Sequence, residues 1–254
     1  MKLTTSGTTV GVAAFLIFLI LLFPADRAYS LMKDNLPVVL YDISGTVWSG
    51  RAGAAVLEKR VMRALNWSVR PWAVLLGRLD LGITFDSGDI KGDGTVGFSL
   101  AKKMRFADVH AQVPPSELQS LLAPKLPPLV QLKGSVVLDA EKIIIDQTTH
   151  RAEHVKGTLL WRDASISGFK EPLGAFRVLF DTIDDTVVGI IGSEGSDGPV
   201  IAEGKFTLDK DGKYDVNIQL AARDRSRQDI SQALNFLGQA GADGKVTIVQ
   251  KGTL

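Results

Sequence analysis

The N-terminal segment has no charged side chain from Leu3 to Ala25, and this run of 23 residues constrains the chain more than any other feature. Its centre, from Val10 to Phe23, is almost wholly apolar. As a helix, 23 residues extend about 34 Å at ~1.5 Å per residue, which is enough to cross a hydrocarbon core of roughly 30 Å. Lys2 precedes the run, and positive charge before such a span favours a cytoplasmic N-terminus.

A cleaved signal peptide is the alternative interpretation of this segment. Its 14-residue apolar core has a suitable length, and Ala28-Tyr29-Ser30 offers small residues two apart for cleavage after Ser30. The charged residues Asp26 and Arg27 lie within the region that a signal peptidase recognises, which favours an uncleaved anchor. Both interpretations send the rest of the chain across the inner membrane. No second apolar run approaches ~18 residues, so the chain crosses once at most.

The expected organisation is a cytoplasmic N-terminus at residues 1–7, a transmembrane anchor at residues 8–25 and one exported domain at residues 26–254. The chain has 29 basic and 28 acidic residues, and this balance gives no reason to expect a nucleic acid as partner. It has no cysteine, so the domain must be stabilised by its own core rather than by disulfides. Thiol catalysis and cysteine-ligated metals are excluded for the same reason.

Short alternating segments led by glycine recur along the exported domain and predict β-strands. They share β-branched or aromatic residues and a period near two. The segments are Gly45–Trp48, Gly92–Leu100, Gly134–Leu138, Gly157–Trp161, Gly204–Leu208 and Gly244–Val249. Residues 205–220 predict the clearest hairpin, in which Asp211-Gly212 forms a two-residue turn. The spacing of these segments is too uneven for a solenoid.

Three short helices are expected, at residues 71–77, 116–122 and 226–237. In the last of them, Ile230 and Leu234 belong to an apolar stripe that we expect to pack on the sheet, with docking of a partner helix as the alternative. The predicted fold is therefore mainly β. It is an extended antiparallel sheet or a sheet pair with a few short helices, preceded by one N-terminal transmembrane helix.

The segment from His150 to His154 matches H-x-x-E-H, a zinc-protease pattern that requires both histidines on one helical face. Residues 143–145 before it and 158–161 after it read as strands, which leaves too little chain for a catalytic helix. We interpret the segment as a polar hairpin connection without a metal.

The remaining motifs also predict no chemistry. Residues 198–205 fail the phosphate-loop pattern, because five residues separate the glycines and Phe206 replaces the metal-binding hydroxyl. Asp181, Asp184 and Asp185 lack calcium-loop spacing and are expected in a solvated turn. The sequence thus predicts no catalytic, cofactor-binding or metal-ligating residue, no cofactor, and a protein that is not an enzyme.

The tryptophans are expected to anchor the core, since large aromatic residues in sheets usually do. Trp161 alternates with Leu159 in a predicted strand, and Trp48 and Trp67 lie in strand-like segments. The alternative is an exposed aromatic groove for a ligand.

Several segments together resemble the protein N family of the bacterial type II secretion system, also called general secretion pathway protein N. The similarity extends over nearly the whole chain. It rests on segments in a fixed order: Gly45–Ala52, Trp67–Pro71, Leu75–Leu79, Gly134 with its strand, Gly157–Trp161, Leu173-Gly174, Asp211–Tyr214, Leu234–Gly238, Gly244 with its strand, and Gly252.

The resemblance implies an accessory inner-membrane component that supports export of folded proteins across the outer membrane of a Gram-negative cell. It also implies a single-pass topology with a periplasmic C-terminal domain, contacts with other secretion components and with membrane lipid through the anchor, and no catalytic residues. A periplasmic β-groove that binds or transports lipid, as in AsmA-like proteins, is the alternative function. The component that is bound and the oligomeric state stay open.

Overall fold

The computed structural model describes residues 4–57, 60–116, 131–149, 151–167, 171–195, 198–224, 226–235, 238 and 240–253. The chain divides into two compact units, residues 1–88 and 89–254. Strands dominate both units, and every strand pairing within them is antiparallel. The prediction of a mainly β, antiparallel fold with a few short helices is confirmed.

In its described residues the first unit contains three α-helices, a 3₁₀ turn and a small sheet. Its elements are α1 (Thr4–Leu21), α2 (Ala25–Met32), η1 (Lys33–Asn35), β1 (Val38–Tyr41), β2 (Ser44–Gly45), β3 (Ser49–Leu57), β4 (Arg60–Val69), α3 (Pro71–Leu75) and β5 (Arg78–Asp86). Within the sheet β3 lies between β1 and β4, β5 pairs with the other side of β4, and β2 pairs with the start of β3.

The N-terminal apolar segment forms a helix that ends four residues before the predicted anchor at residues 8–25 does. α1 ends at Leu21 and α2 begins at Ala25, so the helix is interrupted where the sequence predicts it to continue. Pro24 explains the interruption, because proline has no backbone N–H and disfavours the helical conformation of the residue before it. Within the described residues we find no helix that combines the length and hydropathy of a membrane span.

The first predicted strand, Gly45–Trp48, is wrong: these residues mainly form the turn between β2 and β3. Gly45 has a φ of 93°, and the Thr46 amide donates to the Ser49 carbonyl at 2.9 Å. The Ser49 amide donates in turn to Thr46 Oγ1 at 3.2 Å. Alternation over four residues does not distinguish this side-chain-braced turn from a strand.

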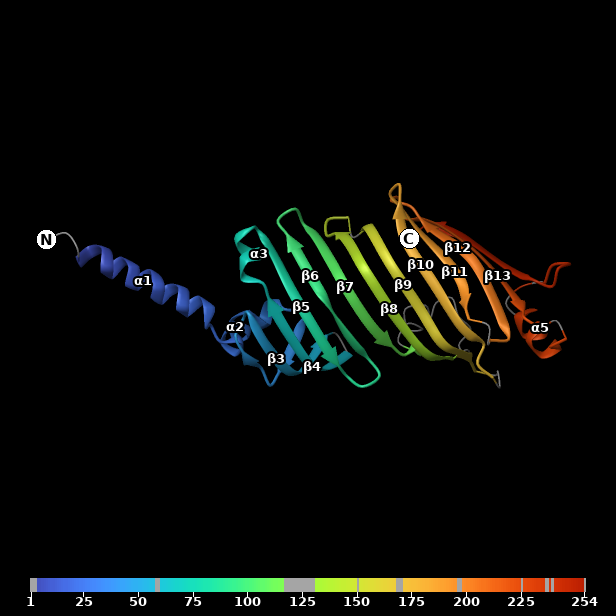
Figure 1. Ribbon diagram of the computed structural model, residues 1–254, viewed down its shortest axis with the longest axis horizontal. Coiled ribbons are helices and arrows are strands. Elements are labelled where there is room, and N and C mark those ends of the chain that lie inside the picture. The colour runs from blue at the N-terminus through green and yellow to red at the C-terminus, as the bar shows by residue number, and fades with distance from the viewer. Residues whose placement is uncertain are drawn as a thin grey trace. The chain divides into compact units, whose positions relative to one another are not determined.

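The second unit is a meander of strands, shown from green to red in Figure 1. Its elements are β6 (Lys91–Ser99), β7 (Lys103–Val113), β8 (Leu132–Asp146), β9 (Arg151–Ile166), β10 (Gly174–Ile183), β11 (Thr186–Glu194), β12 (Val200–Leu208), β13 (Lys213–Ala222), α5 (Gln228–Asn235) and β14 (Val246–Thr253). Each strand pairs with its neighbour in sequence from β6 to β14. Gly134, Gly157 and Gly204 lie inside strands rather than at their starts, because the strands are longer than the alternating segments indicate.

The predicted hairpin at residues 205–220 is confirmed, but its turn is longer than predicted. The strands β12 and β13 pair from Val200↔Ala222 to Leu208↔Tyr214. The Asp209 amide donates to the Lys213 carbonyl at 2.9 Å, which leaves three residues in the loop. Gly212 has a φ of 82°, as expected where a type I turn is followed by a left-handed glycine.

The helix α5 packs its apolar stripe on the sheet, as predicted. Ile230 and Leu234 are buried in a cluster with Leu173, Val200 and Val246. The predicted C-terminal part of this helix includes Phe236 and Leu237, which lie outside the described residues, as does most of the helix predicted at residues 116–122. The helix predicted at residues 71–77 is α3, which ends at Leu75.

One face of the second unit is apolar along most of its strands. A cross-strand row from β7 to β14 contains only apolar residues and glycine: Ala111, Leu138, Leu159, Val178, Ile191, Gly204, Ile218 and Ile248. These residues are half-buried. In the described part of this unit α5 covers one end of the sheet and no second sheet covers the face, so the core is thin for a domain of this size.

Candidate binding groove

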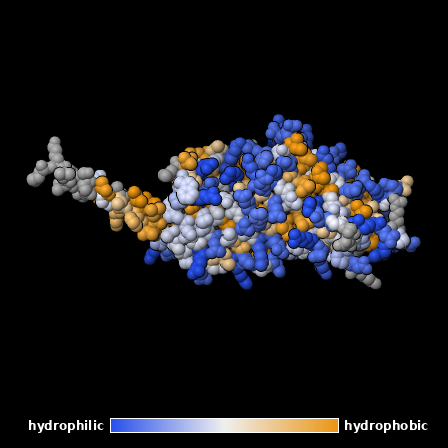
Figure 2. Space-filling view, in the orientation of Figure 1, coloured by the Kyte–Doolittle hydropathy of each residue, from blue (hydrophilic) through white to orange (hydrophobic). Residues whose placement is uncertain are grey.

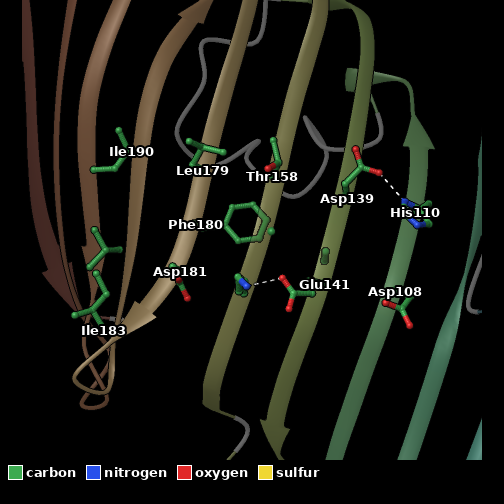
Figure 3. Close-up of a pocket in the computed structure, with 14 residues that line it drawn as sticks. Asp108, His110, Asp139, Glu141, Thr158, Leu179, Phe180, Asp181, Ile183 and Ile190 are labelled. Carbon is green, nitrogen blue, oxygen red and sulfur yellow. Dashed lines mark hydrogen bonds and ion pairs between the residues drawn. The ribbon is translucent and has the colours of Figure 1, made fainter.

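The opposite face of the second unit holds a groove that crosses strands β7 to β11, here called the β7–β11 groove. Its volume is about 590 Å³. Polar side chains line one end and aliphatic side chains line the other (Figure 3). The lining includes Asp108, His110, Asp139, Glu141, Lys156, Thr158, Leu179, Asp181, Ile183, Val188 and Ile190.

The floor of the groove is a single cross-strand row. His110 pairs with Asp139, Asp139 with Thr158, Thr158 with Leu179, and Leu179 with Ile190. Because directly opposed residues of an antiparallel sheet project to the same face, these five side chains share one surface. The row changes from charged residues on β7 and β8 to aliphatic residues on β10 and β11.

Two irregularities in the sheet lie beside the polar end of the groove. The β6–β7 register shifts beside Asp108, which has a φ of 50°. The β8–β9 register shifts between Ala140 and Lys142, which makes Glu141 the extra residue. Bulges turn side chains out of the regular alternation, and here both positions line the groove with a carboxylate.

Two ion pairs partly neutralise the polar end. His110 Nδ1 lies 2.7 Å from Asp139 Oδ1, and Lys156 Nζ lies 2.6 Å from Glu141 Oε2. The hydrogen bond with Asp139 raises the pKa of His110, and the charges of Asp93, Asp139 and Asp108 act in the same direction. The hydrogen bond with Glu141 likewise raises the pKa of Lys156. All these side chains are well solvated, so each pair contributes little to stability.

The aliphatic end of the groove is unusually exposed. The exposed fractions of Leu179, Ile183 and Ile190 are 49%, 56% and 49%. Figure 2 shows hydrophobic surface over β10 and β11 within a face that is otherwise mostly hydrophilic. A cluster of half-exposed aliphatic side chains beside charged groups is typical of an interaction surface.

The zinc-protease pattern is not assembled as a site within the described residues. His150 lies outside them, while Glu153 and His154 belong to strand β9. Glu153 forms an ion pair with Lys103 at 2.6 Å. Among the described residues no group of three or more histidine, cysteine, aspartate or glutamate side chains could hold a metal ion. The predicted hairpin connection is shorter than expected, since β9 already begins at Arg151.

The three aspartates of the predicted solvated turn separate into two places. Asp184 and Asp185 form the two-residue β10–β11 turn, with φ values of 48° and 60°. Positive φ at both central positions defines a type I′ turn, which aspartate tolerates. Asp181 instead faces the β7–β11 groove from β10. Residues 198–205, which fail the phosphate-loop pattern, lead into strand β12, which begins at Val200.

Sequence reasoning did not find the groove. It assigned no role to His110 and expected Asp181 in a solvated turn. A signal was present in residues 179–183. By strand alternation Leu179, Asp181 and Ile183 share one face, which places two large aliphatic side chains beside a charged one on an exposed surface. Pairing of that face with Asp139 requires the register of three strands, which alternation does not provide.

Two tryptophans of the first unit, Trp48 and Trp67, lie in close contacts beside the turn at Gly45–Trp48. Trp48 Nε1 donates to the Ile20 carbonyl at 2.8 Å. Gly50 is paired with Trp67, and a Cβ atom on Gly50 would overlap Cζ2 of that ring. Both tryptophans are half-buried, so they pack without being fully enclosed.

The fold and the groove define a mainly β protein whose candidate site is suited to binding. The family model described as "Type II secretion system (T2SS), protein N" matches residues 37–249, and the chain belongs to this family. It is similar to the type II secretion system protein N of Aeromonas hydrophila, with 26% identity over 95% of each chain. It is also similar to the protein of that name from Vibrio cholerae, with 25% identity over 91% of each chain. No solved structure matches the chain.

Proposed function

We propose that the protein is an accessory component of the type II secretion system that supports export of folded proteins by binding other secretion components. The observation that carries this proposal is the family match over residues 37–249, which includes nearly all strands of both units. The solvated groove and its exposed aliphatic end support a binding role. In this proposal the protein works without catalysis, a cofactor or a metal.

The proposed location is the inner membrane, with residues 8–25 as an uncleaved anchor and residues 26–254 in the periplasm. The apolar segment supports it: Val10, Phe15 and Phe18 are 66%, 66% and 63% exposed on α1. Side chains of this kind require an apolar environment. Membrane fractionation with N-terminal sequencing tests the anchor. A mature chain that starts at Leu31 and is recovered from the soluble periplasm would show that the segment is removed.

Deletion of the gene in its host tests the secretion role. Cargo enzymes should remain folded and active but accumulate partly in the periplasm, while the permeability of the outer membrane to detergent stays normal. Cargo activity inside and outside the cell measures the first effect, and growth on detergent measures the second. Normal export under high cargo load would rule out the secretion role.

Lipid binding is the second candidate function, and the apolar face of the second unit favours it. The row that contains Leu138, Leu159 and Ile218 is half-buried without a covering sheet in the described residues. Acyl chains would bury this surface at about 25 cal/mol per Å². This function predicts the opposite phenotype of deletion: a detergent-sensitive envelope with normal cargo export.

A further inference from the structure

We infer that the β7–β11 groove binds an extended segment of a partner protein in which basic side chains are followed by aliphatic ones. The inference deepens the proposed function and rests on it, since it gives the chemistry by which a secretion component would be recognised. The groove lies on the polar face of the second unit, so its ligand is distinct from anything that covers the apolar face.

Charge at the polar end selects a cation. The carboxylates of Asp108, Asp139, Glu141 and Asp181 line the groove together with the cation Lys156 and with His110. Asp139 and Glu141 are engaged by His110 and Lys156. Among the described residues no ion pair engages Asp108 or Asp181. Asp108 lies on β7 and Asp181 on β10, so two basic side chains of the ligand could each meet one of these carboxylates without displacing an existing pair.

The aliphatic end selects apolar side chains next to the basic ones in the ligand. Leu179, Ile183 and Ile190 come from β10 and β11 and form one patch beside Thr158 (Figure 3). Aliphatic side chains seated there would remove apolar surface from water on both partners. The two ends are connected by the cross-strand row of the groove floor, so one ligand can contact both.

The dimensions fit a short extended segment. The floor row spans five strands from β7 to β11, or about 19 Å at the usual spacing of neighbouring strands. An extended peptide covers this distance with about six residues. An anionic lipid headgroup would be repelled by the carboxylates, so the chemistry favours a protein segment over a membrane surface.

A panel of three labelled six-residue peptides tests this inference on the full chain in zwitterionic lipid nanodiscs. The first peptide is Lys-Arg-Ser-Val-Ile-Val, the second replaces both basic residues by glutamate, and the third replaces the three aliphatic residues by serine. Fluorescence anisotropy measures each dissociation constant. We expect the first peptide to bind at least about ten-fold more tightly than either of the others.

Substitutions in the groove should remove this preference. Asp108→Asn with Asp181→Asn should weaken the first peptide by about ten-fold, since two exposed charge contacts are lost. Asparagine tolerates the positive φ at position 108, so the fold is retained. Ile183→Ser should weaken it by about five-fold or more. The charge-matched control is Asp34→Asn with Asp211→Asn, because both residues are exposed outside the groove.

Three outcomes would overturn the inference: equal binding of the three peptides, equal binding to empty nanodiscs, or equal weakening by the control pair. The thermal unfolding midpoint of every variant shows whether the fold is intact. Because the peptide panel requires no secretion, it is independent of the deletion phenotype. If the peptides do not bind as expected but deletion of the gene blocks export, this inference is wrong and the proposed secretion role stands.

Discussion

Trp48 Nε1 donates a hydrogen bond to the Ile20 carbonyl at 2.8 Å, across 28 residues of sequence. The neighbouring Val47 amide donates to the Phe23 carbonyl at 3.1 Å. These two bonds join the turn before β3 to the C-terminal end of α1 and the residues after it. They supply donors to carbonyls at the end of the helix, where the Ile20 carbonyl also accepts from the Phe23 amide at 3.4 Å.

Trp48→Phe should loosen the end of α1 while leaving the sheet of the first unit folded. The substitution removes the indole N–H and keeps an aromatic ring, so a single hydrogen bond worth about 1 kcal/mol is lost. Hydrogen exchange of the Val47 amide and protease cleavage near Phe23 should both accelerate. Trp72→Phe is the matched control, because Trp72 is 65% exposed. Equal exchange rates in the two variants would contradict the proposed role of Trp48.

Gly189→Ala should destabilise the second unit by about 1–3 kcal/mol, because it overpacks a closed contact. Gly189 is opposite Phe206, and a Cβ atom at position 189 would overlap Cε1 of that ring. Gly192→Ala provides a control on the same strand, since a Cβ atom there meets nothing within 4 Å. The control should change the free energy of unfolding by under about 0.5 kcal/mol. Chemical denaturation compares the two, and equal midpoints would refute the contact.

His110 should titrate above 6.5, because its hydrogen bond with Asp139 raises its pKa. The protonated form is favoured in the folded state. The stabilisation is therefore present below the unfolded pKa and is lost as the pH rises through the folded value. NMR titration of the imidazole should show the pKa falling in Asp139→Asn, with a residual rise from Asp93 and Asp108. An unchanged His110 pKa in that variant would contradict the pairing.

The pKa of Asp229 should be lowered to about 2, mainly because the Arg227 side chain donates to its carboxylate. Arg227 Nε and Nη2 lie 2.9 and 2.8 Å from the two carboxylate oxygens, a bidentate arrangement. Because the folded pKa lies below the unfolded pKa of about 4, the pair stabilises the folded state at pH values above about 4. This stabilisation is lost as the pH falls through about 2. Carboxyl NMR should show this pKa return toward 4 in Arg227→Gln; a carboxyl that titrates normally in the parent chain would exclude the pair.

Trp161→Ala should destabilise the second unit by about 2–4 kcal/mol, somewhat less than a fully buried tryptophan would. The ring is half-buried, its Nε1 donates to the Lys133 carbonyl at 3.0 Å, and its centroid lies 6.0 Å from that of Phe176. Trp161→Phe should recover most of the loss, because only the hydrogen bond is then missing. Thermal unfolding measures both variants. A neutral alanine variant that loses partner binding would identify Trp161 as a contact surface instead.

Local sequence patterns predicted the existence of helices and strands better than the residues at which they begin and end. The stripe of Ile230 and Leu234 predicted both α5 and its packing, because helical spacing directly reports a buried face. Five of the six alternating segments lie mostly in strands, but most of these predict strand starts at glycines that lie inside the strands. Gly157 and Gly189 lie within strands, where rings of neighbouring strands occupy the space above them. That contact depends on register, which a single segment does not contain.

The sequence by itself determined the class of fold, the apolar N-terminal segment and the absence of cysteine chemistry, since each depends on composition or short-range periodicity. Tertiary structure alone decided the candidate site. His110, Asp139 and Ile190 are separated by 29 and 51 residues along the chain, yet one cross-strand row brings them to the same groove. The physical reason is that a sheet joins residues through strand register, and register is set by turns and bulges such as those beside Asp108 and Glu141.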